Sequence, residues 1–146
     1  MSDFEHIVQL NINNFGAQSY FYDYRFRKSF RLLMHYLNEK GWLRITTVII
    51  NGDIAAVDLG CVYRGVYTLL GGGTNRGYPG VAKLINLHHM QRGCRERFNL
   101  IDFLCGDFSW KKKFHLTERP LYLLSNCSTE LPPADDLGLR KAGYVK

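Results

Sequence analysis

This sequence of 146 residues has no long apolar run, no C-x-x-C cysteine pair and no acidic excess. No stretch approaches the ~18 consecutive apolar residues of a transmembrane helix, and the first residues lack the basic and then apolar pattern of a signal peptide. We therefore expect no membrane span and a cytoplasmic location. The apolar share of 46% is too high, and the net charge of +6 too low, for intrinsic disorder, so a folded domain is expected.

Cysteine is scarce and irregularly spaced. A disulfide framework or a zinc site requires denser and more regular spacing. We therefore expect neither a disulfide scaffold nor a structural metal. The four cysteines are Cys61, Cys94, Cys105 and Cys127.

Positive charge is concentrated in the second half of the chain. Residues 1–73 carry seven Lys and Arg against six Asp and Glu, whereas residues 74–146 carry twelve against seven. This bias favours a polyanionic partner, either a nucleic acid or a phosphate-bearing cofactor, and a solvated basic face explains it equally well. The cations form no dense stripe and surround a glycine-rich loop, which argues for a small cofactor and against a nucleic acid.

The first half has the pattern of one helix followed by a three-stranded antiparallel meander. Residues 22–40 are expected to form the helix, and the dipeptides Asn51-Gly52 and Arg64-Gly65 suit tight turns between strands. The residues expected on the buried face of the helix are Phe26, Phe30, Leu33 and Leu37. The strands are expected at Leu43–Ile50, Ile54–Tyr63 and Val66–Leu70.

The second half begins with a glycine-rich loop, Gly71–Gly80, and continues with helix and strand. A helix is expected over Val81–Arg92, with His88 on its buried face and Gly93 as its stop. The apolar run Phe98–Cys105 is typical of a strand buried on both faces. The remaining expected elements are a short helix at Ser109–Phe114, a strand at Pro120–Ser125 and a polar tail over 126–146.

Together these elements predict an α+β fold with a mixed central sheet. The antiparallel meander is followed by a βαβ crossover, in which the helix connects two parallel strands. One domain is expected over residues 1–125, with the C-terminal tail outside it.

The glycine-rich loop is a candidate phosphate site. A glycine-rich turn that opens a helix presents several N–H groups and the positive end of the helix dipole, and glycine lets the backbone approach an anion closely. Neither G-x-x-x-x-G-K-[ST] nor G-x-G-x-x-G is present, but residues 77–82 read G-x-x-G-x-A. The alternative is a flexible loop followed by a helix that Pro79 starts.

This order of elements resembles the GNAT acyltransferase superfamily, whose pyrophosphate loop is Q/R-x-x-G-x-G/A. Gly80 and Ala82 match its last two positions, while Gly77 stands at the first and Arg76 lies one residue early. The chain is most similar to the FemAB-like, CelD-type branch, over about residues 20–125. The motifs that carry this similarity are Tyr78-Pro79-Gly80, Asp102–Asp107 (Asp-Phe-Leu-x-Gly-Asp), Trp110-Lys111 and Phe114.

The resemblance implies a GNAT-like fold and transfer of an acetyl or other acyl group from acyl-CoA, without a metal. The implied acceptor is an amine of a small molecule or of a cell-envelope or polysaccharide precursor. Acyl-CoA would lie between the third strand and the buried strand. The main-chain groups assigned to pantetheine are those of Leu69, Leu70 and Gly71. Those assigned to the pyrophosphate are Gly77, Tyr78, Gly80, Val81 and Ala82, with Arg76 or Lys83 as an added cation.

Such a reaction needs a base for the acceptor ammonium and an acid for the leaving thiolate. GNAT enzymes often place a tyrosine acid on the helix after the buried strand, where this chain has Ser109 and Trp110. Asp107 is the first candidate for the base and could equally cap the next helix. Asp102 must be paired inside its apolar strand, and Lys111 stands at the aromatic-Lys position of the family.

Two other functions stay open. The first is a non-catalytic GNAT-like binding module or an aminoacyl transferase domain of the FemAB type. FemAB-like proteins commonly carry two such domains, so a homodimer or a partner GNAT-like domain is an expected partner. The second is nucleic-acid binding through the basic half, which a steep salt dependence of affinity would reveal.

Overall fold

The computed structural model describes residues 2–105, 109–120 and 142–145. Two helices precede the sheet, α1 (Asp3–Phe15) and α2 (Tyr24–Glu39), and two 3₁₀ turns, η1 (Gly16–Gln18) and η2 (Tyr20–Tyr22), connect them. The sequence analysis predicted α2 but not α1. Ser2 caps α1 by accepting a hydrogen bond from the Glu5 amide, so the Ser-x-x-Glu capping pattern was a signal for this helix.

Among the described residues, the sheet has six strands in the order β1-β2-β3-β4-β6-β5. The first three pair antiparallel, and β3 pairs parallel with β4 after the crossover through α3. This arrangement confirms the predicted α+β class and mixed sheet. The strands are β1 (Leu43–Ile50), β2 (Asp53–Tyr63), β3 (Val66–Thr74), β4 (Leu100–Asp102), β5 (Thr117–Arg119) and β6 (Ala142–Val145). The helices after the meander are α3 (Val81–Arg95) and α4 (Ser109–Lys113).

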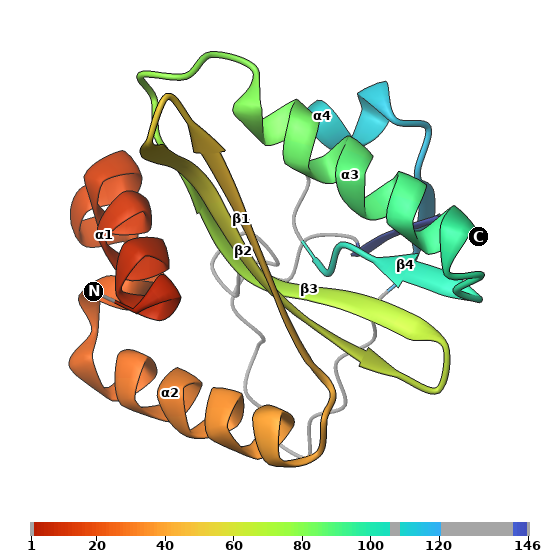
Figure 1. Cartoon of the computed structure of the whole chain (residues 1–146), viewed down its shortest axis with the longest axis horizontal. Coiled ribbons are helices and arrows are strands. Elements are labelled where there is room, and N and C mark those ends of the chain that lie inside the picture. Colours follow the sequence, from red (N-terminus) through yellow and green to blue (C-terminus); the bar gives the residue numbers. More distant parts are fainter. Residues whose placement is uncertain (1, 106–108, 121–141, 146) are drawn as a thin grey trace, which may run out of the picture.

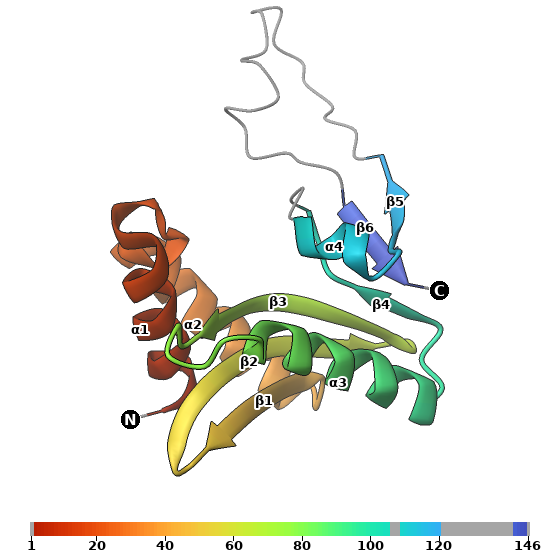
Figure 2. The ribbon, with the colours of Figure 1, turned by 90° about the horizontal axis from the view of Figure 1, so that it is seen from above.

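Helices cover both faces of the meander. Helices α1 and α2 lie on one face and α3 on the other, while β4, β5, β6 and α4 gather at one side of β3 (Figures 1 and 2). No helix in the described ranges is long and apolar enough to cross a membrane.

Four expected boundaries need correction. The run Gly71–Gly73 belongs to β3 instead of to a loop, and Gly93 lies inside α3, where it is buried against Ile101. The buried strand is limited to Leu100–Asp102, because the chain turns away from the sheet at Leu104, whose φ is +54°. Residues 142–145 of the expected tail form β6, between β4 and β5. Residues 121–125 of the expected last strand lie outside the described residues, and the boundary at residue 125 stays a prediction.

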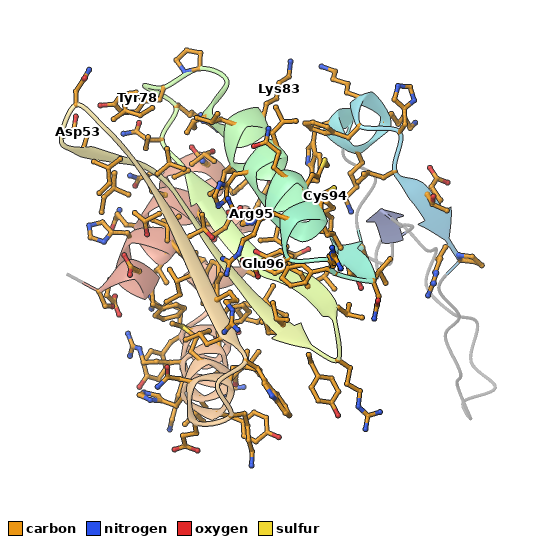
Figure 3. The ribbon with its side chains drawn as sticks, turned by 45° about the vertical axis from the view of Figure 1, so that its right-hand side comes forward. Asp53, Tyr78, Lys83, Cys94, Arg95 and Glu96 are labelled. Atoms are coloured by element: carbon orange, nitrogen blue, oxygen red, sulfur yellow. The ribbon has the colours of Figure 1, made fainter. Side chains whose placement is uncertain are left out.

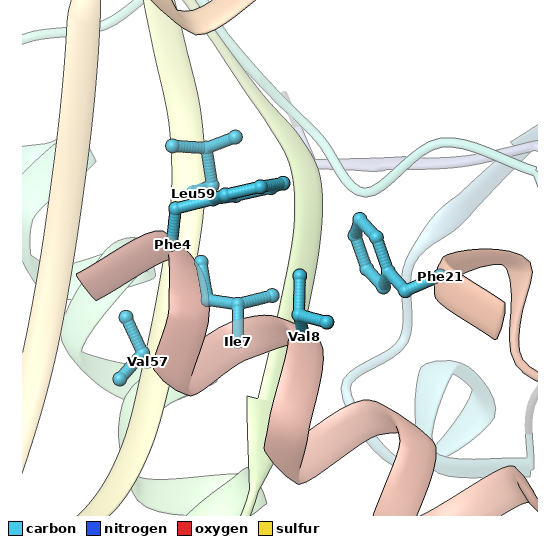
Figure 4. Packing of buried hydrophobic residues seen from close by; sticks show 6 residues of the cluster. All are labelled: Phe4, Ile7, Val8, Phe21, Val57 and Leu59. Atoms are coloured by element: carbon cyan, nitrogen blue, oxygen red, sulfur yellow. The ribbon is translucent and has the colours of Figure 1, made fainter. Parts of the chain in front are cut away.

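The apolar core on the α1 face explains why α1 lies so close to β2 and β3. The side chains of Ile7, Val57 and Leu59 have no exposed surface, and Phe4, Val8 and Phe21 surround them (Figure 4). Helix α2 contributes Phe30, Met34 and Leu37 to this side of the sheet. The predicted buried face of α2 is therefore partly wrong, since Phe26 and Leu33 remain exposed.

Candidate functional site

Strands β3 and β4 separate after a short parallel pairing. Their parallel pairing runs from Val66 opposite Leu100 to Thr68 opposite Asp102, where β4 ends. Strand β3 continues to Thr74 and stays paired with β2 on its other edge. From Leu69 onward, therefore, β3 has an edge that β4 no longer covers.

Helix α1 covers the far end of this edge. The side-chain amide of Asn11 donates to the Gly72 carbonyl at 3.0 Å, and that of Asn14 donates to the Thr74 carbonyl at 2.7 Å. The segment between the last β4 pair and these contacts is Leu69–Gly71. These three residues are the ones that the sequence analysis assigned to pantetheine.

A β-bulge lies in the same segment. On β2, Leu59 pairs with Gly71 and the next residue, Gly60, pairs with Leu69, so Leu70 has no partner residue. A bulge leaves the extra residue's main-chain groups outside the regular ladder and bends the strand. The structure thus combines an uncovered strand edge and an unpaired residue within three positions.

In the loop before α3, some of the backbone amides predicted to bind pyrophosphate already donate hydrogen bonds within the loop. The Gly77 amide donates to Asn75 Oδ1 at 2.9 Å, the Tyr78 amide to the Asn75 carbonyl at 3.1 Å, and the Val81 amide to the Tyr78 carbonyl at 3.2 Å. These bonds form because Asn75 and Tyr78 close two successive turns. In the described ranges, Gly80 and Ala82 are the predicted donors whose N–H groups have no main-chain acceptor.

The two candidate cations of this loop have different environments. The Arg76 guanidinium donates to the Asn14 carbonyl at 2.6 Å and so ties the loop to the C-terminal end of α1. Lys83 lies on the exposed first turn of α3, and its side chain extends away from the helix (Figure 3). Of these two side chains, Lys83 is the better placed to meet an anion at the start of α3.

Tyr78 anchors the loop to the β1–β2 hairpin. Its hydroxyl donates to Asp53 Oδ2 at 2.7 Å, and the two side chains meet at the tip of the hairpin (Figure 3). The hydrogen bond to Asp53 raises the pKa of the Tyr78 phenol. A shallow pocket of about 370 Å³ lies beside this anchor. Its lining residues are Ile50, Gly77, Tyr78, Pro79, Gly80, Val81 and Leu84.

Asp102 and Lys111 lie on the other side of the separation. Asp102 Oδ1 accepts the Leu104 amide at 2.7 Å, and burial raises the pKa of this carboxyl. The Lys111 side chain is buried, and its Nζ donates to the carbonyls of Phe103, Leu104 and Cys105 at 3.1, 2.6 and 3.3 Å. Both side chains therefore stabilise the turn in which the chain leaves the sheet.

Comparison with known proteins places this arrangement in a family. Residues 1–112 match the family model described as "Acetyltransferase (GNAT) domain". The chain belongs to the GNAT family. Membership covers most of the chain and makes this protein a GNAT-type acyltransferase domain. A search of the curated proteins found no match.

Two solved structures share the fold of this GNAT domain. The PaiA N-acetyltransferase of Thermoplasma acidophilum, solved in complex with coenzyme A, has a TM-score of 0.62 at 9% identity and covers 99% of this chain and 92% of its own. The ribosomal-protein-S18-alanine N-acetyltransferase of Escherichia coli has a TM-score of 0.51 at 14% identity and covers 81% of this chain and 73% of its own. At these identities the likeness concerns the fold.

The catalytic candidates of the GNAT domain remain predictions. Asp107 lies outside the described residues. Asp102 and Lys111 are brought to one turn, and the charge of Lys111 lowers the Asp102 pKa against the larger effect of burial. Their side chains hydrogen-bond to main-chain groups just after β4, and their roles in catalysis stay predictions.

The sequence analysis missed a buried ionisable pair. His89 Nε2 lies 2.9 Å from Asp58 Oδ2, and both side chains are almost fully buried between α3 and β2. The expectation that His88 is the core histidine is wrong, because the buried face of α3 runs through Val81, Ile85, His89 and Gly93, and His88 is exposed. The i, i+4 spacing of these residues and Asp58, an acid in the middle of the apolar strand β2, were the available signals.

Burial dominates the electrostatics around this pair. Desolvation raises the pKa of Asp58, and hydrogen bonding to His89 opposes that effect. The Tyr67 ring stacks on His89 with centroids 4.9 Å apart, and its hydroxyl is buried with no hydrogen-bond partner among the described residues. Burial, reinforced by the negative charge of Asp58, raises the pKa of Tyr67. The pair lies inside the packed layer, so it acts on α3 and not directly on a substrate.

Proposed function

We propose that this GNAT domain transfers an acyl group, with acetyl as the first candidate, from acyl-CoA to a primary amine. The observation that carries this proposal is the combination of the uncovered β3 edge at Leu69–Gly71 and the bulge at Leu70. An extended pantetheine chain would use the main-chain groups of these residues as an added strand would. The solved coenzyme A complex of a protein with the same fold supports the choice of ligand.

The start of α3 fits a pyrophosphate. Gly80 has φ +88°, and a Cβ added there would meet no atom within 4 Å, so the approach to the Gly80 and Ala82 amides is open. These amides begin a 15-residue helix, whose positive dipole end favours an anion. Lys83 on the same turn adds a full positive charge. We therefore assign the pyrophosphate to Gly80, Ala82 and Lys83, and give Gly77, Tyr78, Val81 and Arg76 the task of holding the loop.

When it is bound, acyl-CoA supplies a thioester whose carbonyl carbon an amine can attack. The chain must then orient the thioester, accept a proton from the ammonium and supply one to the thiolate. We propose Asp107 as the base, because it follows the turn that Asp102 and Lys111 stabilise. Asp102 and Lys111 are proposed as the residues that position it.

The acceptor follows from sequence resemblance. The FemAB-like, CelD-type motifs at residues 78–80 and 102–111 favour an amine on a small molecule or on an envelope or polysaccharide precursor. A second GNAT-like domain or a second copy of the chain is proposed as the partner that completes the acceptor site. The cytoplasmic location expected from the sequence stays a prediction.

The test is a thermal-shift titration with CoA and acetyl-CoA of the wild type and two glycine variants. Saturable stabilisation is expected for the wild type, since a ligand that binds only the native state raises its stability. Gly80→Glu is expected to abolish the shift by placing a carboxylate beside the phosphates. Gly41→Glu is the matched control, because Gly41 also has positive φ and open space but follows α2. No shift at millimolar CoA in the wild type would refute the proposal.

One observation favours a non-catalytic binding module as the second candidate. Ser109 and Trp110 stand where many GNAT enzymes carry the tyrosine acid, and Lys111 binds main-chain carbonyls. Thiol release from acetyl-CoA in the presence of a panel of primary amines separates the two functions. CoA binding without release for any amine would favour the module.

A further inference from the structure

Three aromatic side chains, which we call the aromatic row, lie where α2 leads into β1, beside the β2–β3 turn (Figure 1). Tyr36 comes from α2, Trp42 from the connection to β1 and Tyr63 from the end of β2. The Tyr36 and Trp42 rings meet edge to face with centroids 6.1 Å apart, and the Trp42 and Tyr63 rings lie 4.5 Å apart. The Val62 amide donates to the Trp42 carbonyl at 2.8 Å, so the main chain fixes Trp42 beside β2.

The aromatic row is open to solvent and has a cation at each end. Tyr36 is 49% exposed and Tyr63 is 44% exposed. The Lys40 ammonium lies 5.7 Å from the Tyr36 ring centroid, and the Arg64 guanidinium lies 5.2 Å from that of Tyr63. Single exposed apolar side chains are ordinary on a protein surface, whereas a contiguous exposed group marks an interaction site. The aromatic row is such a group.

The tertiary structure gathers positive charge around the aromatic row. The β2–β3 turn lies beside the segment after α3, because the Asn99 amide donates to the Gly65 carbonyl at 2.7 Å. Segments 36–44, 62–66 and 95–99 therefore come to one end of the molecule, and together they carry five cations and two acids. The cations are Lys40, Arg44, Arg64, Arg95 and Arg97, and the acids are Glu39 and Glu96.

One of these two acids is already neutralised. Arg92 Nε donates to Glu96 Oε1 at 2.6 Å. This hydrogen bond, together with the charges of Arg95 and Arg44, lowers the pKa of Glu96, so the end of α3 and the start of β1 are close together. The exposed Glu39 is left as the other acid of these segments. The surface around the aromatic row therefore has a clear excess of positive charge, which suits a polyanion.

The chemistry of this surface fits single-stranded RNA. Unpaired bases stack on aromatic side chains, and the phosphates between them pair with cations, whereas the bases of a duplex are not accessible in this way. The hydroxyls of Tyr36 and Tyr63 have no hydrogen-bond partner among the described residues. They can therefore bind a ribose 2′-OH, the group that distinguishes RNA from DNA. A membrane surface calls for a broader apolar face than three rings between two cations.

We propose that the aromatic row binds single-stranded RNA. The bases stack on the exposed parts of the Tyr36 and Tyr63 rings, and the phosphates pair with Lys40 and Arg64. All of these residues belong to the first half of the chain, so this surface differs from the basic second half that the sequence indicated. It lies at the opposite end of β3 from the loop before α3, a distance of roughly 30 Å for a strand of this length. The inference is therefore independent of the proposed acyl-CoA site.

The test measures the fluorescence anisotropy of labelled oligouridine and of its deoxy counterpart, each about ten nucleotides long, with the full chain. We expect the wild type to bind the ribose oligomer more tightly than the deoxy oligomer. Tyr36→Ala and Tyr63→Ala should each weaken binding of oligouridine by about ten-fold, because each removes one stacking platform. Tyr20→Ala is the matched control, because Tyr20 is 72% exposed but lies outside the aromatic row, and it should leave the affinity unchanged.

Three further variants separate the hydroxyl and the charges from the rings. Tyr63→Phe keeps the ring, so it should retain most of the affinity for oligouridine and lose much of the preference over the deoxy oligomer. Lys40→Gln and Arg64→Gln should each reduce the slope of log K against log salt concentration by about 0.7, the value for one phosphate contact with a single strand. Lys28→Gln, at an exposed position of α2 outside the aromatic row, should leave the slope unchanged.

Several results would overturn the inference. They are no measurable affinity of the wild type for oligouridine at about 50 mM salt, equal affinities for the ribose and deoxy oligomers, and equal losses in Tyr36→Ala and Tyr20→Ala. Tighter binding of the wild type to phosphatidylglycerol vesicles, lost in the same variants, would assign the surface to a membrane instead. Circular dichroism verifies the fold of each variant, and if Tyr63→Ala does not fold, Tyr36→Ala and the two charge variants decide the question.

The thermal shift with CoA separates this inference from the proposed function. It should be the same in the wild type and in every folded variant of the aromatic row, because the two sites lie at opposite ends of β3. Loss of the CoA shift in Tyr36→Ala or Arg64→Gln would contradict the independence of the two sites and overturn the inference. Absence of a CoA shift in the wild type would refute the acyl-CoA site and leave the RNA measurements as they are.

Discussion

The two faces of the meander are stabilised by different interactions, although the same strands form both. On the face toward α1 and α2, Val57 and Leu59 of β2 pack among phenylalanine rings. On the face toward α3, Asp58, which lies between them, meets His89 in a buried pair. Apolar contacts have no preferred direction, whereas a buried ion pair or hydrogen bond is stable only in one geometry. Both faces have an apolar cluster, which on the α3 face includes Val81 and Ile85, and the α3 face adds to it a polar pair with a defined geometry.

The largest effect is expected from His89→Ala. Removing one partner of a buried pair leaves the other group uncompensated and typically costs about 3–5 kcal/mol. Urea unfolding should show this loss, and His88→Ala, at the exposed neighbour, should change the free energy of unfolding by less than about 0.5 kcal/mol. Adding Asp58→Asn to His89→Ala should recover part of the loss. If His89→Ala and His88→Ala lowered the free energy of unfolding equally, the buried polar pair would not stabilise the α3 face.

On the apolar face, Leu59→Ala should destabilise by about 2–5 kcal/mol, because it opens a cavity in a fully buried cluster. Ile49→Ala, at a strand position that is 64% exposed, should cost less than about 1 kcal/mol. The comparison is again made by urea unfolding. A similar loss at both positions would mean that the α1 face does not form the core described here.

Adjacent glycines test both faces in one strand. Gly72→Ala and Gly73→Ala should each cost about 1–3 kcal/mol, since the added methyl group meets the Asp58 carboxylate on the α3 face in the first and helix α1 in the second. In an Asp58→Ala background the loss from Gly72→Ala should largely disappear, because the clashing carboxylate is gone. The loss from Gly73→Ala should persist there. If Asp58→Ala reduced the losses from Gly72→Ala and Gly73→Ala equally, the two faces of the sheet would not be independent.

The smallest expected effect is a pH dependence confined to the α3 face. Burial raises the Asp58 pKa above its ordinary value of 3.8, so the native state binds this proton more tightly than the unfolded state does. Stability from this group is therefore fully present at low pH and is lost as the pH rises through the native pKa. The ionisable groups that interact with it are His89 and Tyr67, and Tyr67 in turn interacts with Arg92 and Cys61. The free energy of unfolding of the wild type, relative to Asp58→Asn, should fall as the pH rises above the ordinary Asp pKa of 3.8, and a rise would contradict the assignment.

Elements with strong local signals were predicted well. At both hairpins the two turn residues have positive φ, as the sequence pattern requires: Asn51 at +52° with Gly52 at +88°, and Arg64 at +48° with Gly65 at +75°. The start of α3 after Gly80 was also predicted at the correct residue. These features depend on backbone preferences of neighbouring residues, so the sequence pattern suffices for them.

The wrong predictions concern positions whose structure or burial depends on contacts with segments distant in the sequence. The glycines at positions 71–73 have the composition of a loop, yet their pairing with residues 57–59 of β2 makes them strand residues. His88 and His89 lie on different sides of α3, and only the side with His89 faces the sheet. The periodicity of the sequence did not show which of the two sides is buried. The donor set of the loop was overestimated because Asn75 closes the turn with its own side chain.

The sequence by itself determined the local order of this protein: a helix, three strands joined by two glycine-containing turns, and a glycine-started helix that leads to a parallel strand. The tertiary structure decided which histidine is buried, which glycines packing requires, and where β3 loses its partner. Those properties depend on contacts such as Asp58 with His89 and Asn11 with Gly72, which lie 31 and 61 residues apart in the chain. Such contacts arise only when the two faces of the sheet are covered, and local preferences do not encode them.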